Sequence, residues 1–519
     1  MASKYMTGEP YKLQGCRIAF TNWQFVRPGS FAWLDKNGNI MPLTGTIGTE
    51  DAVFKGTDLA FGVRLKAEKA IMPDEPVLIP DSSFEKFVDI HTVINVDSVF
   101  RAWGTCTLKD GNVFSSYYES DDGWHWERPD VGMIEYQGKR SNNFIESFQG
   151  TVFYDSSGSV EEKYKAIGEF IFTEDDFEKY CQERPRDFDP ISLRYDLKEK
   201  GDTAWICGAK GWVSPDGFRW NAIDTPLVVT HTDTQIVCYY DMFLKKYVAY
   251  FRDWNAVPRA ENYHNPDKLP WKRAGRRSIG RAETDNFRAF PLPELMLESG
   301  PDVSPTEVLY TNCKTIFPGT YNQHLMFPTL WNMADDTTTV RVASSSDGKV
   351  WHLFLNGPVF KTADFGKWNG GAVFSHPNLL ELPDGNFVLP YTGYDVPHKY
   401  PRGQWRYAVG YSMWPKGRLV ALEAREKGEF ATIAVIPPSE KIILNAVTKR
   451  AGFIQVEAAR LNGTPIQGRE FSNSVPCVGD CYKKLVVWKS HDNLGLDKNE
   501  PVILRFRLNK AAIYFIDFV

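Results

Sequence analysis

Short stretches in which apolar and polar residues alternate run through most of the chain, which is the period-two pattern of half-buried β-strands. Pairs of such stretches precede a turn that occurs three times, at residues 120–126 (SDDGWHW), 214–220 (SPDGFRW) and 345–351 (SSDGKVW). All three turns read Ser-x-Asp-Gly-x-x-Trp. We expect Ser and Asp to close each turn on its own backbone, Gly to adopt a positive φ, and Trp to cover the hairpin.

The same strand pattern continues in two further units in which this turn is degraded. The five units span residues 92–126, 150–220, 234–285, 325–351 and 371–411. A turn signature that returns within a longer β unit is typical of radially repeated folds. Five units of four antiparallel strands predict a five-bladed β-propeller over residues 89–424.

The regions on either side of these units have different patterns. Residues 1–88 are irregular and punctuated by Gly and Pro, and we expect this lead-in to pack on the propeller and to donate an outer strand. Residues 425–519 hold strand-like runs without the Ser-Asp-Gly turn, which predicts a β-sandwich. The predicted fold class is therefore all-β, a five-bladed β-propeller with a C-terminal β-sandwich domain.

Two insertions interrupt the propeller units. Residues 173–183 begin with Thr173-x-x-Asp176, a capping signal that predicts a short amphipathic helix. Residues 255–272 are rich in Pro, Trp, Tyr, His and Arg and predict a long loop.

The composition is that of a large folded chain. Its 519 residues are 43% hydrophobic and 14% aromatic, which allows a substantial core. The net charge of −5, without a basic stripe, argues against a nucleic-acid partner. No apolar run is long enough to span a membrane, and residues 1–12 lack the apolar stretch of a secretory leader. We expect a cytoplasmic protein, or a secreted one if a leader has been removed.

The topology of a propeller separates structural residues from candidate site residues. The innermost strand starts at the ligand-binding face, so the Ser-Asp-Gly turns belong on the far face. We therefore expect a structural role for the acidic residues in and next to these positions, which are Asp121, Asp216, Asp347, Glu119 and Glu283. Residues at the starts of first and third strands and the ends of second strands are expected at the mouth. These are Asp89, His91, Glu146, Gln149, Glu169, His231, Asp233, Gln235, Arg252, Asp253, Trp254, Arg276, Arg277, Tyr310, Asn312, Trp368, Asn369, Asp395 and His398.

Four runs carry a resemblance to known proteins. They are residues 76–81 (PVLIPD), 231–235 (HTDTQ), 276–283 (RRSIGRAE) and 417–424 (GRLVALEA). With its predicted architecture, the chain resembles glycoside hydrolase families 32 and 43, and is most similar to a poorly characterised bacterial group labelled glycosyl hydrolases. The Asn-Asp-Pro-Asn-Gly, Arg-Asp-Pro and Glu-Cys motifs of family 32 are absent, so its catalytic residues are not carried over.

Glycosidic cleavage needs one carboxylic acid to protonate the leaving oxygen and one carboxylate to activate water or attack the sugar. Asp233 is the first choice for one of them, because it opens an innermost strand between two threonines and next to His231. Glu146, Glu169 and Asp253 are the candidates for its partner, with Asp395 as a further carboxylate at the mouth.

Aromatic and basic residues at the same face suit sugar binding. Trp254, Trp331 and Trp368 can stack on sugar rings. Arg252, Arg276 and Arg277 would suit a carboxylated or sulfated sugar through bidentate hydrogen bonds, or would pair with neighbouring acids such as Asp253 or Glu261. The expected substrate-binding residues are His91, Gln149, His231, Gln235, Arg252, Trp254, Arg276, Arg277, Tyr310, Asn312, Trp368 and Asp395.

The leading hypothesis is a glycoside hydrolase that takes a terminal or near-terminal sugar of an oligo- or polysaccharide, acidic or neutral, into a pocket on the propeller axis. The alternative is a polysaccharide lyase, with His91, His231 or Tyr310 as base and Arg252 or Asn312 neutralising a uronate. A non-catalytic glycan-binding protein is the third hypothesis. No cofactor is required, an axial calcium ion is compatible with the fold, and the sequence leaves metal ligands and oligomeric state open.

Overall fold

The computed structural model describes residues 9–34, 53–81, 83–194, 205–256, 275–301, 303–401 and 404–519. The chain divides into two compact units. The first comprises Met1–Glu68, Phe317–Gln323 and Lys416–Val519, and the second comprises Lys69–Ile316 and His324–Pro415. The predicted lead-in is thus divided at residue 68, because strands within it pair with C-terminal strands. No helix among the described residues is long and apolar enough to cross a membrane.

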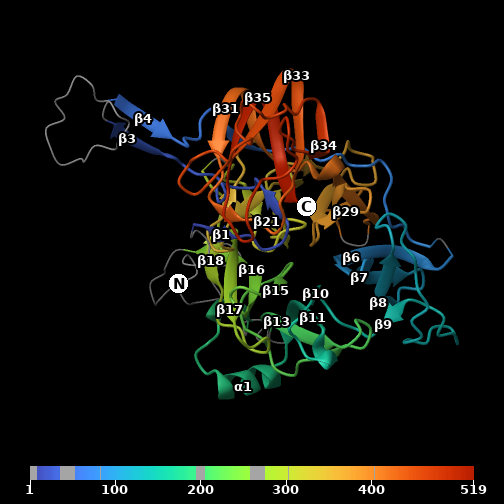
Figure 1. The fold of residues 1–519 in the computed structure, drawn as a ribbon. Helices are drawn as coiled ribbons and strands as arrows, with labels where there is room; N and C mark the ends of the chain where they lie inside the picture. The colour runs from blue at the N-terminus through green and yellow to red at the C-terminus, as the bar shows by residue number, and fades with distance from the viewer. Residues whose placement is uncertain are drawn as a thin grey trace. The chain divides into compact units, whose positions relative to one another are not determined.

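The second unit is built of antiparallel sheets, and in most of them the strands are consecutive along the chain (Figure 1). The first sheet contains β6 (Glu85–Val96), β7 (Val99–Leu108), β8 (Val113–Ser120) and β9 (Phe144–Ile145). The second contains β10 (Thr151–Tyr154), β11 (Tyr164–Phe172), β13 (Trp205–Ser214), β12 (Leu193–Arg194) and β14 (Asn221–Ala222). The third contains β15 (Val237–Asp241), β16 (Lys246–Ala256), β17 (Gly275–Thr284) and β18 (Glu294–Leu297).

Residues 307–361 form two four-stranded sheets rather than one. One contains β19 (Glu307–Leu309), β22 (Thr329–Asn332), β23 (Thr337–Val340) and β26 (Phe360–Lys361). The other contains β20 (Lys314–Ile316), β21 (His324–Met326), β24 (Ala343–Ser345) and β25 (His352–Leu353). The last sheet of the unit contains β27 (Ala372–Ser375), β29 (Phe387–Tyr394), β28 (Leu380–Glu381) and β30 (Tyr407–Trp414).

Five of the six sheets just described contact one another in a closed circle, as the blades of a β-propeller do. β6 contacts β10, β10 contacts β15, β17 contacts β19, β23 contacts β27, and β30 returns to β6. Ile71 and Leu78 form isolated bridges to Met413 and Val409 of β30, and the donated outer strand stays a prediction. The number of blades stays a prediction, because residues 307–361 are divided between two sheets.

The predicted helix is present as α1 (Glu174–Glu183), which follows β11. Its N-cap Thr173 accepts a hydrogen bond from Asp176 N at 3.2 Å, and Asp176 Oδ2 accepts from Thr173 N at 3.1 Å. This reciprocal capping box is the one that the sequence predicts. The predicted loop 255–272 lies almost entirely outside the described residues.

The three Ser-x-Asp-Gly turns are formed as predicted. In the second turn, Gly217 N donates to Ser214 Oγ at 2.8 Å, and the next two amides donate to Asp216 Oδ1, each at 2.9 Å. The first and third turns repeat both contacts. In the first turn the acceptor is Asp122 and not Asp121, because the carboxylate directly before Gly is the one that reaches the following amides.

An aromatic side chain from a neighbouring sheet binds each of these turns. The contacts are Tyr411 Oη to Gly123 O, Trp103 Nε1 to Gly217 O and Tyr250 Oη to Gly348 O, each 2.8 Å. Since β30, β7 and β16 supply these donors, each turn fastens its own sheet to the one beside it. The repeated turn is therefore a structural device, as predicted for the far face.

Replacing Asp122 by Ala should lower the free energy of unfolding by about 1–2 kcal/mol, because two backbone amides lose their acceptor. Asp121→Ala is the matched control: this neighbouring carboxylate is exposed, and its loss should change stability by less than about 0.5 kcal/mol. Urea unfolding followed by tryptophan fluorescence measures both. Equal losses in the two variants would contradict this account of the turn.

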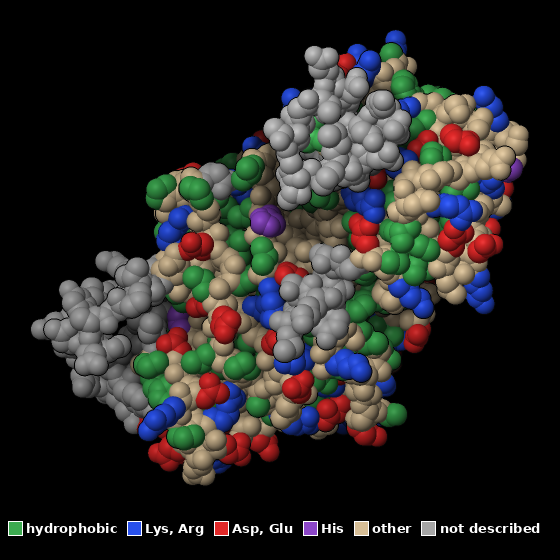
Figure 2. All heavy atoms as spheres, turned by 60° about the vertical axis from the view of Figure 1, so that its left-hand side comes forward, with side chains coloured by type: hydrophobic (Ala, Val, Ile, Leu, Met, Phe, Trp, Pro, Cys, Tyr) green, Lys and Arg blue, Asp and Glu red, His purple; other side chains and the backbone are tan. Residues whose placement is uncertain are grey.

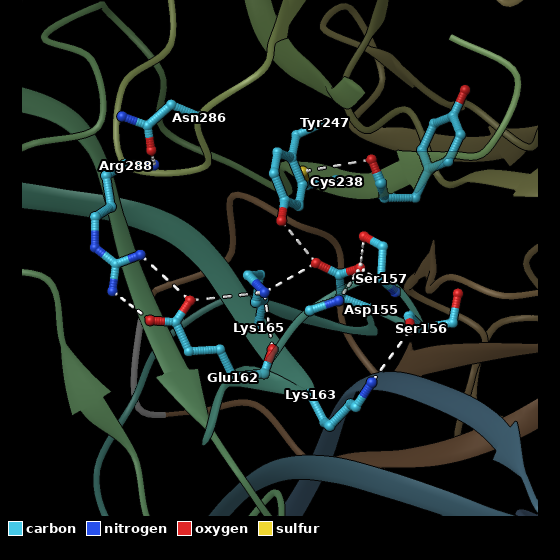
Figure 3. A network of polar contacts seen from close by, with 12 residues as sticks. Asp155, Ser156, Ser157, Glu162, Lys163, Lys165, Cys238, Tyr247, Asn286 and Arg288 are labelled. Atoms are coloured by element: carbon cyan, nitrogen blue, oxygen red, sulfur yellow. Dashed lines mark hydrogen bonds and ion pairs between the residues drawn. The ribbon is translucent and has the colours of Figure 1, made fainter. Parts of the chain in front are cut away.

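A buried ion pair in the second sheet is also bound by a tyrosine of the third sheet (Figure 3). Lys165 of β11 is 2% exposed, and its Nζ donates to Asp155 Oδ2 at 2.9 Å and to Glu162 O at 2.8 Å. Tyr247 of β16 donates its hydroxyl to the same Asp155 oxygen at 2.7 Å, and Ser157 Oγ donates to Oδ1 at 2.6 Å. All polar atoms of this pair thus have partners, which is the condition under which a buried charge is tolerated.

The first unit is built around one large antiparallel sheet. Its strands are β34 (Asp480–Leu485), β33 (Ile442–Ala459), β35 (Ile503–Phe518), β31 (Val420–Ala431), β5 (Arg64–Ala67) and β2 (Arg17–Ala19). Two small sheets, β1 (Tyr11–Lys12) with β32 (Val435–Ile436) and β3 (Ser30–Leu34) with β4 (Val53–Thr57), complete it. Phe430 stacks on Phe506 at 4.8 Å between ring centroids in the core of this unit.

The C-terminal region is rich in strands, as predicted, but its composition differs from the predicted sandwich of residues 425–519. Strands β2 and β5 come from the N-terminal region and pair with β35 and β31. The longest strand of this region, β33, has a register shift between Thr448 and Phe453 in its pairing with β35. The sandwich arrangement itself stays a prediction.

Candidate active site

The candidate residues that the structure brings together lie at one end of the strands of the second unit. Glu169 is near the end of β11, Arg252 is near the end of β16, and Asp233 lies just before β15. The Arg252 guanidinium is fully buried; Nη1 is ion-paired with Asp233 Oδ1 and Nη2 donates to Tyr310 O at 2.8 Å. The ion pair holds the Asp233 carboxylate in a fixed place while leaving it 26% exposed.

Glu169 lies in a very different environment from Asp233. Burial, with a smaller contribution from the negative charge of Asp233, raises the pKa of Glu169 from 4.5 to about 7, and Arg252 opposes the shift. A carboxyl group with this pKa is about half protonated at pH 7, whereas an ordinary glutamate is almost fully ionised, so it can donate a proton. Two neighbouring carboxyl groups in contrasting environments are the usual arrangement of an acid and a base in one site.

Arg277, near the start of β17, lies among aromatic rings. Its guanidinium carbon is 4.9 Å from the centroid of Tyr310, 5.2 Å from that of Trp254 and 5.2 Å from that of Trp331. Burial, with a smaller effect of Arg252, lowers the pKa of Arg277 to about 10. Among the described residues, no carboxylate forms an ion pair with Arg277.

A cavity of about 250 Å³ opens beside these groups. Its lining residues are Tyr310, Phe374, Tyr394, Pro397, His398 and Trp405. Tyr310 Oη and His398 Nε2 are 2.9 Å apart, and burial lowers the pKa of His398 to about 4, so this imidazole is neutral at pH 7. Walls of aromatic rings with a few polar groups are typical of small-molecule pockets.

A third carboxylate, Asp89 of β6, lies in a hydrogen-bonded chain with two residues that the sequence did not suggest. Thr392 donates its hydroxyl to Asp89, and His376 Nε2 is 2.6 Å from the Thr392 oxygen, so His376 is the donor there. Burial lowers the pKa of His376 to about 4, with Asp89 opposing. His91 of the same strand lies 2.7 Å from Thr105 Oγ1.

Of the other predicted carboxylates, three have contacts that do not involve Asp233. Glu146 Oε2 accepts from Trp220 N at 2.7 Å, which ties it to the second Ser-Asp-Gly turn. Asp395 Oδ1 accepts from Arg406 N at 2.9 Å and closes a loop. Asp253 follows Arg252 on β16 and therefore points to the other face of the sheet, over Gly280 of β17.

Asp253 nevertheless has an unusual environment. Burial raises its pKa to about 6, although Trp254 N donates to Oδ1 at 2.7 Å. This proton-binding group is held away from the Asp233–Arg252 pair by the alternation of the strand.

Several predicted binding residues hold the scaffold together. Gln235 donates to Ser375 O at 2.9 Å and accepts from Cys313 N at 2.7 Å. Asn312 Nδ2 donates to Gln235 O at 3.0 Å. Such backbone contacts position the segments around the site.

Two more predicted binding residues donate hydrogen bonds to backbone carbonyls. Arg276 donates to Ser304 O at 3.1 Å and to Glu307 O at 2.6 Å. Trp368 Nε1 donates to Asp74 O at 2.8 Å.

His231 and Gln149 complete the predicted set. His231 is 2% exposed and lies between Trp205 and Trp254, with ring centroids 5.8 and 5.7 Å away. Gln149 is exposed. Trp205 stands at the start of a third strand, so the topology rule applied to the sequence could have found it.

The residues that the structure describes contain no group of three or more His, Cys, Asp and Glu side chains that could hold a metal ion. The axial calcium ion stays a prediction.

Figure 2 shows acidic and basic side chains interspersed over the described surface that faces the viewer.

No protein-family model matches the sequence, and no curated protein matches it. Solved structures with a similar fold include an N-acetylgalactosamine deacetylase from F. plautii in complex with blood group B trisaccharide, at TM-score 0.39 and 11% identity, covering 68% of this chain and 96% of that one. A thermostable family-43 glycoside hydrolase has TM-score 0.39 and 12% identity, covering 66% and 96%. A GH62 hydrolase in complex with xylotriose has TM-score 0.35 and 12% identity, covering 67% and 98%. At these similarities no residue of theirs is transferred to this chain.

Proposed function

We propose that this protein is a glycoside hydrolase that takes a terminal or near-terminal sugar into the aromatic cavity beside Tyr310. The observation that carries the proposal is the contrast between Glu169, whose pKa is raised to about 7, and Asp233, whose carboxylate is paired with Arg252. Glycosidic cleavage requires one protonated and one ionised carboxyl group close together. The aromatic walls of the cavity suit the C–H faces of a sugar ring.

In this mechanism Glu169 gives its proton to the glycosidic oxygen as the bond from that oxygen to the anomeric carbon breaks. Asp233 takes a proton from the water that adds to the anomeric carbon, or adds there itself before water displaces it. Arg252 keeps Asp233 in place through its ion pair and through its contact with Tyr310 O. Proton nuclear magnetic resonance of the first product distinguishes inversion from retention.

The test is a panel of oligosaccharides and aryl glycosides assayed for release of reducing ends across pH 4 to 9. We expect kcat/KM to fall as pH rises through about 7, because Glu169 must be protonated to act as the acid and loses its proton there. Glu169→Gln should remove this alkaline limb from whatever activity remains. A wild-type profile that is flat between pH 6 and 9 would contradict the assignment of Glu169.

A polysaccharide lyase is the second candidate, favoured by the Tyr310–His398 pair in the cavity wall. A neutral imidazole can accept the tyrosine proton, and tyrosine can then take the proton next to a uronate carboxylate. Lyase products absorb in the near ultraviolet through their new double bond, whereas hydrolase products do not. Binding to glycans without either product would instead favour a non-catalytic binding protein.

A further inference from the structure

Arg277 differs from Arg252 and Arg281 in forming no ion pair with an acid among the described residues. Arg252 is paired with Asp233, and Arg281, four residues after Arg277 on β17, is paired with Glu283 at 2.8 Å. Arg277 Nε is buried without a hydrogen-bond partner among the described residues. Its surroundings are the faces of Tyr310, Trp254 and Trp331, which exclude water but offer no full negative charge.

The acids around this cluster are already engaged. The negative charge of Asp233 acts on Arg277, but this carboxylate is ion-paired with Arg252. Asp336 accepts from Trp331 Nε1 at 2.7 Å through Oδ1 and from Lys399 N at 2.7 Å through Oδ2. Lys399 Nζ lies 4.8 Å from the Trp331 centroid, on the same ring that Arg277 contacts. Two cations thus share an aromatic platform, so the local field favours an incoming anion.

Arg277 also shares Tyr310 with the cavity. The Tyr310 ring is 4.9 Å from the Arg277 guanidinium and forms part of the cavity wall. A sugar substituent that extends from the cavity past the Tyr310 ring would meet the guanidinium. A planar guanidinium binds carboxylate or sulfate oxygens through two parallel hydrogen bonds, whereas a neutral hydroxymethyl group offers it one oxygen.

We infer that the substrate carries an oxyanion, the carboxylate of a uronic acid or a sulfate ester, and that Arg277 binds this group; the inference rests on the proposed hydrolase for the identity of the reaction. Arg252 does not take this role, because Asp233 neutralises it. Arg276, the preceding residue, does not take it either, because its Nη2 already donates to two backbone carbonyls and its side chain points to the other face of the strand.

The kinetic test compares aryl glycosides that differ only in this group: a uronide, its neutral hexoside and a 6-sulfated hexoside. Arg277→Gln should raise KM for the preferred anionic substrate by about 10- to 100-fold with a smaller change in kcat, because a charge-assisted hydrogen-bond pair is lost. The neutral hexoside should be affected less than threefold. The wild-type preference between uronide and sulfate identifies the oxyanion, and a larger loss at low salt is expected.

Arg276→Gln is the matched control, since it removes the same charge from the neighbouring position. It should leave the ratio of anionic to neutral activity unchanged. A wild-type enzyme that prefers the neutral hexoside, or an Arg277→Gln variant that loses both substrates equally, would overturn the inference while leaving the hydrolase proposal standing.

A binding arm keeps the inference testable if no substrate is turned over. Calorimetric titration of wild type and Arg277→Gln with galacturonic acid, galactose and galactose 6-sulfate measures the affinity for each group directly. We expect wild type to bind an anionic sugar at least tenfold more tightly than galactose, and the variant to lose this difference. Equal binding of all three sugars by wild type would overturn the inference, whereas anion-selective binding without catalysis would count against the hydrolase proposal alone.

Discussion

Replacing Asp233 by Asn should cut turnover by about 10³-fold or more while leaving the fold and the affinity for substrate largely intact. The amide is nearly isosteric with the carboxylate and still offers Arg252 an oxygen to bind. It can neither carry the negative charge nor take up a proton. The measurement is kcat and KM on the best substrate of the panel, with circular dichroism and thermal unfolding as checks on the fold.

Glu169→Gln should lower turnover by a similar factor, but only for substrates whose leaving group must be protonated. When the phenol of an aryl glycoside is strongly acidic, the phenolate leaves without being protonated. This variant should therefore recover most of its activity on such a substrate. Asp233→Asn should not recover, because its defect lies in the attack on the sugar. The two substitutions therefore separate the two roles.

Glu146→Gln is the control for both substitutions. It neutralises another carboxylate from the predicted set, whose contact is with Trp220 N in a turn. Its turnover per folded molecule should stay within about threefold of wild type. If the turnover of Asp233→Asn itself remains within tenfold of wild type, Asp233 is not catalytic. Asp89, or the lyase mechanism with Tyr310 and His398, then becomes the favoured alternative.

The parts of the fold that the sequence predicts well are those determined by residues close together in the chain. The Ser-x-Asp-Gly turns close on their own amides, and Thr173 and Asp176 cap α1 within one helical turn. The pairing of β2 with β35 joins residues about 500 positions apart. Nothing in a local pattern specifies such a pairing, so the sequence predicts only that the N-terminal region packs on the propeller.

The candidate site shows the same division. Topology places Asp233, Arg252 and Arg277 at one end of the strands, and the first two are indeed in contact. Which of two adjacent arginines faces the cavity depends on the register of β17, because neighbouring side chains on a strand point to opposite faces. The raised pKa of Glu169 depends on how deeply packing buries it, which its local sequence does not reveal.

Stability offers the second large expected effect, at the buried ion pair between Lys165 and Asp155 (Figure 3). Lys165→Met should lower the free energy of unfolding at pH 7 by about 3–5 kcal/mol, because Asp155 is then left buried without its cation. Methionine fills a similar volume, so the loss reports on charge more than on packing. Urea unfolding followed by tryptophan fluorescence measures it.

Lys163→Met is the matched control, since Lys163 lies two residues away and donates only to Ser156 O at 3.1 Å. This substitution should lower the free energy of unfolding by less than about 0.5 kcal/mol. The double variant Lys165→Met with Asp155→Asn should be more stable than Lys165→Met alone, because the unpaired charge is gone. A double variant that is less stable than Lys165→Met would show that Asp155 contributes through other contacts.

The dependence on pH gives a further check on the same pair. Burial alone would raise the pKa of Asp155, but hydrogen bonds from Ser157, Lys165 and Tyr247 outweigh it, and the pKa lies below its usual value of 3.8. A carboxyl group with a lowered pKa stabilises the folded state above the unfolded-state value, and this contribution is lost as pH falls through the folded-state pKa. In Lys165→Met the buried carboxyl can instead take up a proton as the solution becomes acidic. The stability difference between wild type and Lys165→Met should therefore shrink from pH 7 to pH 4, and a constant difference would contradict a charge-based origin.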